Sequence, residues 1–196
     1  MAHKELKKIF LSASIPLPER NQEFFDTADF IAIRDAVRAL ATIILPKCHL
    51  IWGGHPSITP IIRYVLARMD TNLKQHVTLY QSKYFESSFP EDNFDFEHIQ
   101  LTSKMPTREE SLNVMRKEMI SQNNFSAGVF IGGMEGILDE YILFKKYNPR
   151  AIVLPIASTG AATKILYDNY INEKNDRLQN DWAYMSLFRD LLLNKL

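Results

Sequence analysis

A short apolar segment that breaks on paired glycines and resumes as a helix occurs twice in this chain, and it limits the folds that the chain can adopt. In residues 126–141, an apolar run with the composition of a buried parallel strand is followed by three glycines and a helical pattern. In residues 49–66, an apolar run is followed by Gly53 and Gly54 and then by a helix. Strands that alternate with helices predict a parallel sheet.

The same alternation continues through the rest of the chain. We expect strands at Lys8–Ala13, His49–Trp52, His76–Gln81, Phe96–Leu101, Val129–Ile131 and Ala151–Pro155. We expect helices over Thr27–Leu45, through Ile61–Leu66, after the capping-box residues Thr107–Glu110, through Ile137–Phe144, and over Thr163–Asn172 and Trp182–Leu193. The sequence therefore predicts an α/β protein with a single doubly wound, mainly parallel, Rossmann-like sheet flanked by helices.

The length and charge of the chain restrict its organisation and its partners. A chain of 196 residues is expected to form one domain, residues 1–196, with its C-terminal helices, about 161–196, packed on the sheet or at an oligomer interface. Its 23 basic and 23 acidic side chains balance, which argues against general nucleic-acid binding, because that needs a basic excess. A small anionic ligand needs only a helix N-terminus and one or two arginines.

Cysteine content and hydropathy predict a cytoplasmic protein. The single cysteine, Cys48, cannot form an intrachain disulfide, and cysteine and histidine show no zinc-site spacing, so we expect neither a metal nor a cofactor. The N-terminal apolar run is too short for a signal peptide, and no window approaches the roughly 18 apolar residues of a membrane span. We therefore expect a reducing cytoplasm and no membrane partner.

The glycines of residues 126–141 have a chemical consequence beyond the fold. A strand that breaks at Gly132 and Gly133 and restarts as a helix near Gly136 presents bare backbone N–H groups at the positive end of a helix dipole, which favours phosphate. Asp139 and Glu140 follow about one helical turn later, where a carboxylate could meet a ribose hydroxyl. The alternative is an ordinary strand–turn–helix corner.

The second glycine loop, Gly53–Pro60, repeats this logic. Ser57 or Thr59 is expected to cap the following helix, with Pro60 at a first helical position. His55 could donate to a phosphate or stack on a base, or it could simply be solvated.

Two serines at the end of the first expected strand, an arginine in the next loop and two phenylalanines farther along the chain are also candidates for contact with a ligand. Ser12 and Ser14 could bond phosphate or ribose at the carboxyl end of the strand, or could merely terminate it. Arg20 lies in a proline-rich loop, where it could reach over a site or be solvated. Phe85 and Phe89 could cover a purine ring, or could form a satellite hydrophobic cluster.

The combination resembles the SLOG superfamily, a Rossmann-like group that includes the LOG phosphoribohydrolases and the DNA-processing Smf/DprA proteins. The pair Arg116-Lys117 lies 16 positions before Gly132, which is similar to the LOG spacing. The segment Gly132–Glu140 resembles the LOG glycine motif with one inserted residue. With the Gly53–Pro60 loop and the strand that ends at Ser14, the chain is especially similar to the SLOG branch found beside Sir2 and TIR domains in bacterial anti-phage systems.

The resemblance implies roles for the residues that match. Phosphate contacts would come from both glycine loops, namely Gly53, Gly54, His55, Ser57 and Thr59 in the first, and Gly132, Gly133, Met134, Glu135 and Gly136 in the second. Arg116 would match the LOG arginine, and Glu140, or Asp139 if the insertion is placed differently, would match the acidic residue that meets the ribose.

Departures from the LOG motif leave more than one function open. Ile131 stands in place of the motif's proline, and Ile137 in place of its threonine. We expect a sensor that binds a phosphorylated ribose compound, such as an ADP-ribose-type cyclic signal, with an effector protein and a homo-oligomeric state as further expectations. The alternatives are a nucleotide N-glycosidase with Arg116 and Glu140 as catalytic residues, and an interaction protein whose site is unused.

Overall fold

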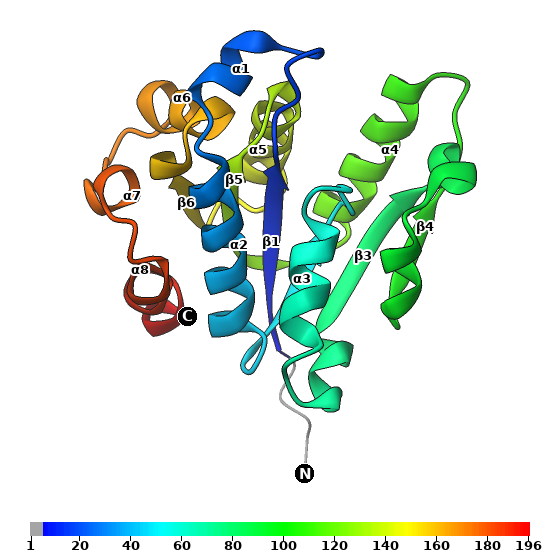
Figure 1. The fold of residues 1–196 in the computed structure, drawn as a ribbon, viewed down its shortest axis with the longest axis horizontal. Coiled ribbons are helices and arrows are strands. Elements are labelled where there is room, and N and C mark those ends of the chain that lie inside the picture. The colour runs from blue at the N-terminus through cyan, green and yellow to red at the C-terminus, as the bar shows by residue number, and fades with distance from the viewer. Residues whose placement is uncertain (1–5) are drawn as a thin grey trace.

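The computed structural model describes residues 6–196, and a six-stranded parallel sheet forms its centre. The strands are β1 (Lys7–Ser14), β2 (Cys48–Trp52), β3 (Val77–Ser82), β4 (Ile99–Thr102), β5 (Phe125–Gly132) and β6 (Ile152–Ile156). Their order is β4-β3-β2-β1-β5-β6, and every neighbouring pair is parallel. The predicted doubly wound, Rossmann-like sheet is confirmed, with β1 near its middle (Figure 1).

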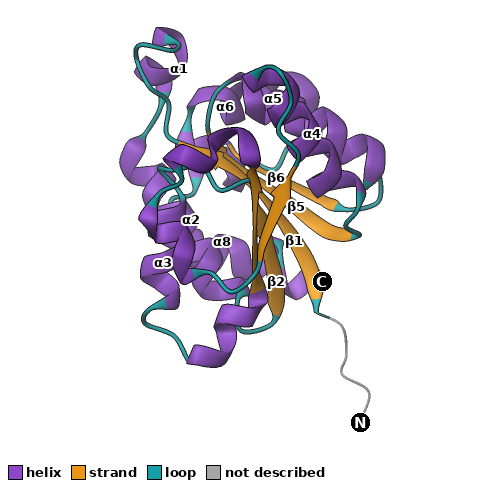
Figure 2. Cartoon of the chain, turned by 90° about the vertical axis from the view of Figure 1, so that its right-hand side faces the viewer, coloured by secondary structure: helices purple, strands orange, loops and turns teal. Residues whose placement is uncertain are grey.

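Helices cover both faces of this sheet. The α-helices are α1 (Gln22–Thr27), α2 (Phe30–Ile44), α3 (Thr59–Leu66), α4 (Arg108–Ser121), α5 (Glu135–Tyr147), α6 (Ala161–Tyr170), α7 (Arg177–Asn180) and α8 (Tyr184–Leu191). Short 3₁₀ segments are η1 (Thr71–His76), η2 (Lys83–Ser88), η3 (Glu91–Asp95), η4 (Ala157–Thr159) and η5 (Leu193–Lys195). Figure 2 shows the strands nearly edge-on, with α2, α3 and α8 on one side and α4 and α5 on the other.

Alternation along the strands produces two hydrophobic layers. In β1, Ile9 and Leu11 belong to the cluster under α2, α3 and α8, whereas Phe10 between them belongs to the cluster under α4, α5 and α6. Both layers are fully closed around β1, because all three side chains are at most 2% exposed. A strand buried on both faces needs a continuous apolar run, which explains the sequence of its middle part.

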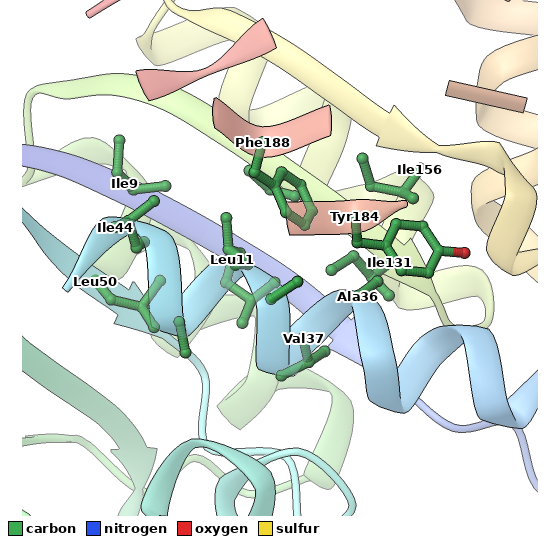
Figure 3. Close-up of a cluster of buried hydrophobic side chains, with 14 of the residues drawn as sticks. Ile9, Leu11, Ala36, Val37, Ile44, Leu50, Ile131, Ile156, Tyr184 and Phe188 are labelled. Atoms are coloured by element: carbon green, nitrogen blue, oxygen red, sulfur yellow. The ribbon is translucent and has the colours of Figure 1, made fainter. Parts of the chain in front are cut away.

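The last helix packs on the α2 side of the sheet. Tyr184 and Phe188 of α8 lie close to Ile156 of β6 and to α2 (Figure 3). The apolar stripe of α8 therefore contributes to the same core as Ile9 and Leu11.

The strand order fixes where a ligand site can form. The chain moves outward from β1 to β4, then returns across the sheet to place β5 on the other side of β1. The long helices that follow β1 and β5, α2 and α5, lie on opposite faces of the sheet, and open α/β sheets bind ligands at such a switch point.

The expected helix over Thr27–Leu45 is wrong at its start. The chain forms the short α1, leaves helical geometry at Ala28 and Asp29, and starts α2 at Phe30. The Asp29 carboxylate accepts a hydrogen bond from the Ala32 N–H group, so this residue caps a new helix instead of continuing an old one.

Other element ends also differ from the sequence prediction. The fourth strand begins at Ile99 instead of Phe96, because the preceding segment folds as η3 and Phe96 is buried after it. The last helix begins at Tyr184, and Trp182 lies outside it, 58% exposed. β5 begins at Phe125, four residues before the expected Val129, and α5 continues to Tyr147. The other boundaries differ by one or two residues, which reflects ordinary fraying.

Candidate functional site

A cavity of about 480 Å³ opens at the carboxyl ends of β1 and β2 and at the start of α5. Most of the residues expected at a ligand site line it, namely Ser12, Ser14, Gly53, Gly54, His55, Ser57, Arg116, Met134, Gly136 and Glu140. Four expected residues do not line it, namely Thr59, Gly132, Gly133 and Glu135. The two glycine loops thus meet at a single cavity, and ligand binding by its residues stays a prediction.

Arg116 and Glu140 form the most buried charged pair of the cavity. Nε of Arg116 lies 3.2 Å from Oε1 of Glu140, and each side chain is only 15% exposed. The other carboxylate oxygen of Glu140 accepts a hydrogen bond from the Ser12 hydroxyl. Asp139 also faces this arginine, with Oδ2 at 3.4 Å from Nη1, but its side chain is 60% exposed. Glu140 is therefore the carboxylate that is fixed inside the cavity, and Asp139 lies at its edge.

Gly136 is required for this arrangement by its lack of a side chain. A Cβ atom at Gly136 would lie 2.3 Å from Nη2 of Arg116, well inside van der Waals contact. The guanidinium group therefore lies directly over the first turn of α5. Gly136 was expected to contact phosphate, and the structure shows that an arginine of the same chain already uses the space beside its Cα atom.

The N-terminus of α5 retains free donors. Within residues 6–196, the N–H groups of Met134, Glu135 and Gly136 have no acceptor, and the N-cap residue Met134 makes no side-chain capping bond. Unsatisfied N–H groups at a helix start carry partial positive charge. Since Met134 and Gly136 line the cavity, an anion placed there could accept these hydrogen bonds.

Gly132 and Gly133 shape the corner instead of presenting donors to the cavity. The Gly132 N–H group donates to Oγ1 of Thr159 at 2.9 Å, and the Gly133 N–H group donates to the Ser14 carbonyl oxygen at 2.8 Å. Both glycines have positive φ, +58° and +76°. These values explain the glycines, but the expected phosphate contact through their N–H groups would require breaking existing bonds.

His55 is a neutral histidine in the wall of the cavity. Burial, followed by the positive charges of Arg20 and Arg108, lowers the pKa of its imidazole to about 4. Nδ1 lies 3.3 Å from the backbone nitrogen of Ser57, which can only donate, so the proton resides on Nε2. The ring can therefore donate one hydrogen bond from Nε2.

Ser57 and Thr59 hold the loop together. The Ser57 hydroxyl lies 2.8 Å from Nδ1 of His55 and accepts from the Ile15 N–H group at 3.1 Å. The Thr59 hydroxyl donates to the His55 carbonyl oxygen and accepts from the indole N–H group of Trp52, and Thr59 is fully buried. These bonds leave neither hydroxyl free to cap α3, so the expected N-cap is wrong. Ile58 occupies that position without a side-chain bond.

Gly54 needs its glycine for two reasons. Its φ is +63°, and a Cβ atom would lie 2.0 Å from Nε2 of Gln81. That amide instead donates to the Gly54 carbonyl oxygen at 2.9 Å, and Gln81 is 5% exposed. The bond fixes the carbonyl, and within residues 6–196 the Gly54 N–H group has no acceptor.

Glu135 faces solvent. Its carboxylate accepts a hydrogen bond from Nδ2 of Asn21 at 2.8 Å, and Asn21 also caps α1. This contact joins the loop after β1 to the start of α5. Glu135 therefore supports the rim of the cavity and does not line it.

Several residues that sequence reasoning gave no role, or only an open one, line the same cavity. Arg108 was expected only as part of a capping box, which the structure confirms at Thr107 and Glu110. Gln81 was assigned only to a strand. Phe85 and Phe89 line the cavity from the segment between β3 and β4. No local pattern would have placed Arg108 there, because its position depends on how α4 crosses the sheet.

Two absences hold for the described part of the chain. In residues 6–196 no three side chains among histidine, cysteine, aspartate and glutamate lie close enough together to hold a metal ion. Over the same residues, no helix has the length and apolarity to cross a bilayer.

Comparison with known proteins gives a family and a fold. The model of the SLOG cluster3 family matches residues 23–192. The X-ray structure of TM1055, a target of the Northeast Structural Genomics Consortium, is similar with a TM-score of 0.61 at 14% identity, covering 97% of this chain and 100% of that one. At that identity the likeness concerns the fold alone. No curated protein matches the sequence.

Proposed function

We propose, because the chain belongs to the SLOG cluster3 family, that its cavity binds a phosphorylated ribose compound derived from a nucleotide. The observation that carries the proposal is the meeting of Arg116, Glu140 and the start of α5 at a single cavity. Free N–H groups and a guanidinium suit phosphate, and a fixed carboxylate suits ribose hydroxyls.

From these contacts we propose a place in the cavity for each part of the ligand. A phosphate group would accept hydrogen bonds from the N–H groups of α5 and from Arg116, which lies over that turn. The Glu140 carboxylate would accept from a ribose hydroxyl, while Ser12 keeps it oriented. Phe85 and Phe89 provide apolar surface for a base.

The role that we propose is that of a sensor. The ligand would be an ADP-ribose-type cyclic signal, and the protein would respond to it within a bacterial defence or signalling system. It would act in the cytoplasm, as a homo-oligomer, and pass the signal to an effector protein. The support for this branch of the superfamily is the resemblance of the Gly53–Pro60 loop and of the strand that ends at Ser14.

The alternative function is a LOG-type hydrolase, which the position of Glu140 favours. The buried Glu140 carboxylate could act as general base and take a proton from the water that attacks the anomeric carbon. The nucleobase would leave as the glycosidic bond breaks and would be protonated. Arg116 would orient the phosphate. Against this role, both carboxylate oxygens of Glu140 already have partners in the chain, Ser12 and Arg116.

One experiment separates the two functions. Purified protein is incubated with nucleoside monophosphates, NAD, ADP-ribose and cyclic ADP-ribose isomers. A rise in melting temperature with recovery of intact ligand supports the sensor, and release of free base supports the hydrolase. The proposal fails if no compound shifts the melting temperature and no base is released. Arg116→Gln serves as the site variant, and it should abolish either response.

A further inference from the structure

Two arginines outside the family motifs line the cavity from different elements of the fold. Arg20 lies in the loop between β1 and α1, and Arg108 is the first residue of α4. Both line the cavity, and neither has a carboxylate within 4.0 Å among residues 6–196. By contrast, Arg116 is paired with Glu140.

The neutral ring of His55 lines the same cavity as both arginines. Arg20 and Arg108 are the two charged groups that lower its pKa, so their guanidinium groups act on the same imidazole. Arg116 is not among the causes of that shift, and its guanidinium group lies over the first turn of α5 beside Glu140. The cavity lining therefore holds one arginine that is paired at α5 and two that have no carboxylate partner among residues 6–196.

The charge of the lining leaves an excess for a ligand to balance. Three arginines line the cavity against one carboxylate, that of Glu140, which is an excess of two positive charges. A monophosphate held at Arg116 would leave Arg20 and Arg108 without an anion. A volume of about 480 Å³ lies within the range of sites for ligands larger than a phosphate group.

We propose that Arg20, Arg108 and His55 form a second anion position, so that the preferred ligand carries two phosphoryl groups. The class of ligand is a nucleotide with a diphosphate bridge or with two phosphates. The arginines would supply charge-assisted hydrogen bonds, and Nε2 of His55 would supply a neutral one. This inference rests on the proposed function and deepens it, since it names the ligand class of the same cavity.

The test compares ADP-ribose with AMP by calorimetric titration. We expect Arg20→Gln and Arg108→Gln each to weaken ADP-ribose binding about tenfold, a loss of about 1.4 kcal/mol. AMP binding should stay unchanged, because its single phosphate occupies the Arg116 position. Arg108→Lys should lose less ADP-ribose affinity than Arg108→Gln, since lysine keeps the positive charge but cannot form the two parallel hydrogen bonds of a guanidinium group. Arg189→Gln, on the exposed surface of α8, is the matched control and should change neither titration.

The outcomes separate this inference from the proposed function. Equal loss for both probes, or no loss for ADP-ribose, overturns the second anion position while nucleotide binding stands. If the wild-type protein binds neither ADP-ribose nor AMP, the second anion position is refuted, and the thermal-shift assay with the full set of compounds decides whether the proposed function stands. Because Arg20 and Arg108 are exposed, their glutamine variants should fold, and melting curves check this.

Discussion

The ion pair between Arg116 and Glu140 should contribute measurably to stability as well as to binding. Glu140→Gln keeps the shape of the side chain and an oxygen for the Ser12 hydroxyl, but it removes the charge. Exposed pairs contribute about 0–1 kcal/mol, and breaking a fully buried pair costs about 3–5 kcal/mol. Since each side chain is 15% exposed, we expect a loss of about 2 kcal/mol.

That loss should appear as a fall in melting temperature of about 4–8 °C, given the usual slope for a chain of this length. Urea denaturation of the wild type, Glu140→Gln, Arg116→Met and the double variant gives the coupling energy. We expect a coupling of about 1–2 kcal/mol, because removing the second partner relieves the unpaired charge. Asp168→Asn, which breaks the exposed Lys164–Asp168 pair, is the control and should cost about 0.5 kcal/mol or less. Additive effects of Arg116→Met and Glu140→Gln would refute the reasoning.

Three further predictions concern stability alone. Gly54→Ala should lower the free energy of unfolding by about 2 kcal/mol or more, because alanine at φ +63° is strained and its Cβ atom would collide with Gln81. An unchanged urea midpoint would contradict this. Thr107→Ala removes a capping box and should cost about 1 kcal/mol, with no loss expected if the cap were unimportant. His49 and His55 have pKa values lowered to about 4, mainly by burial, so the folded state binds fewer protons than the unfolded state. The contribution of these two histidines to the free energy of unfolding should therefore be fully present above about pH 6.5 and should fall as the pH is lowered toward 4.

The histidine prediction has its own control. His49→Gln should remove part of the decline without changing the part that comes from His55. The full shift corresponds to about 2 kcal/mol at pH 5, and we expect about 1 kcal/mol because the ring is only partly buried. The same fall in stability between pH 7 and pH 5 in the wild type and in this variant would contradict the assignment.

The sheet and its glycine corners could be predicted from the sequence because their signals are local. An apolar run long enough for a buried strand predicts the strand, and the glycines that follow it predict where the strand ends. The positive φ values of Gly54, Gly132 and Gly133 show why these corners need glycine. The use of their N–H groups was not predictable, because the acceptors Ser14 and Thr159 arrive from other strands and loops.

The candidate site was only partly accessible to sequence reasoning for the same reason. The family resemblance implied that Arg116 and an acidic residue of the next helix belong to one site, and the structure pairs them. It also shows that Glu140, and not Asp139, is the more buried partner. Ser57 and Thr59 looked like helix caps, yet their hydroxyls bond to His55, Ile15 and Trp52. A hydroxyl beside a helix start has several possible partners, and tertiary structure decides among them.

The most direct test of this account is a crystal structure of the protein with ADP-ribose bound. We expect one phosphate at the N–H groups of Met134 and Gly136 beside Arg116, the other between Arg20 and Arg108, and a ribose hydroxyl at Glu140. Electron density for the nucleotide at another surface, with the cavity between β1 and α5 left empty, would contradict it.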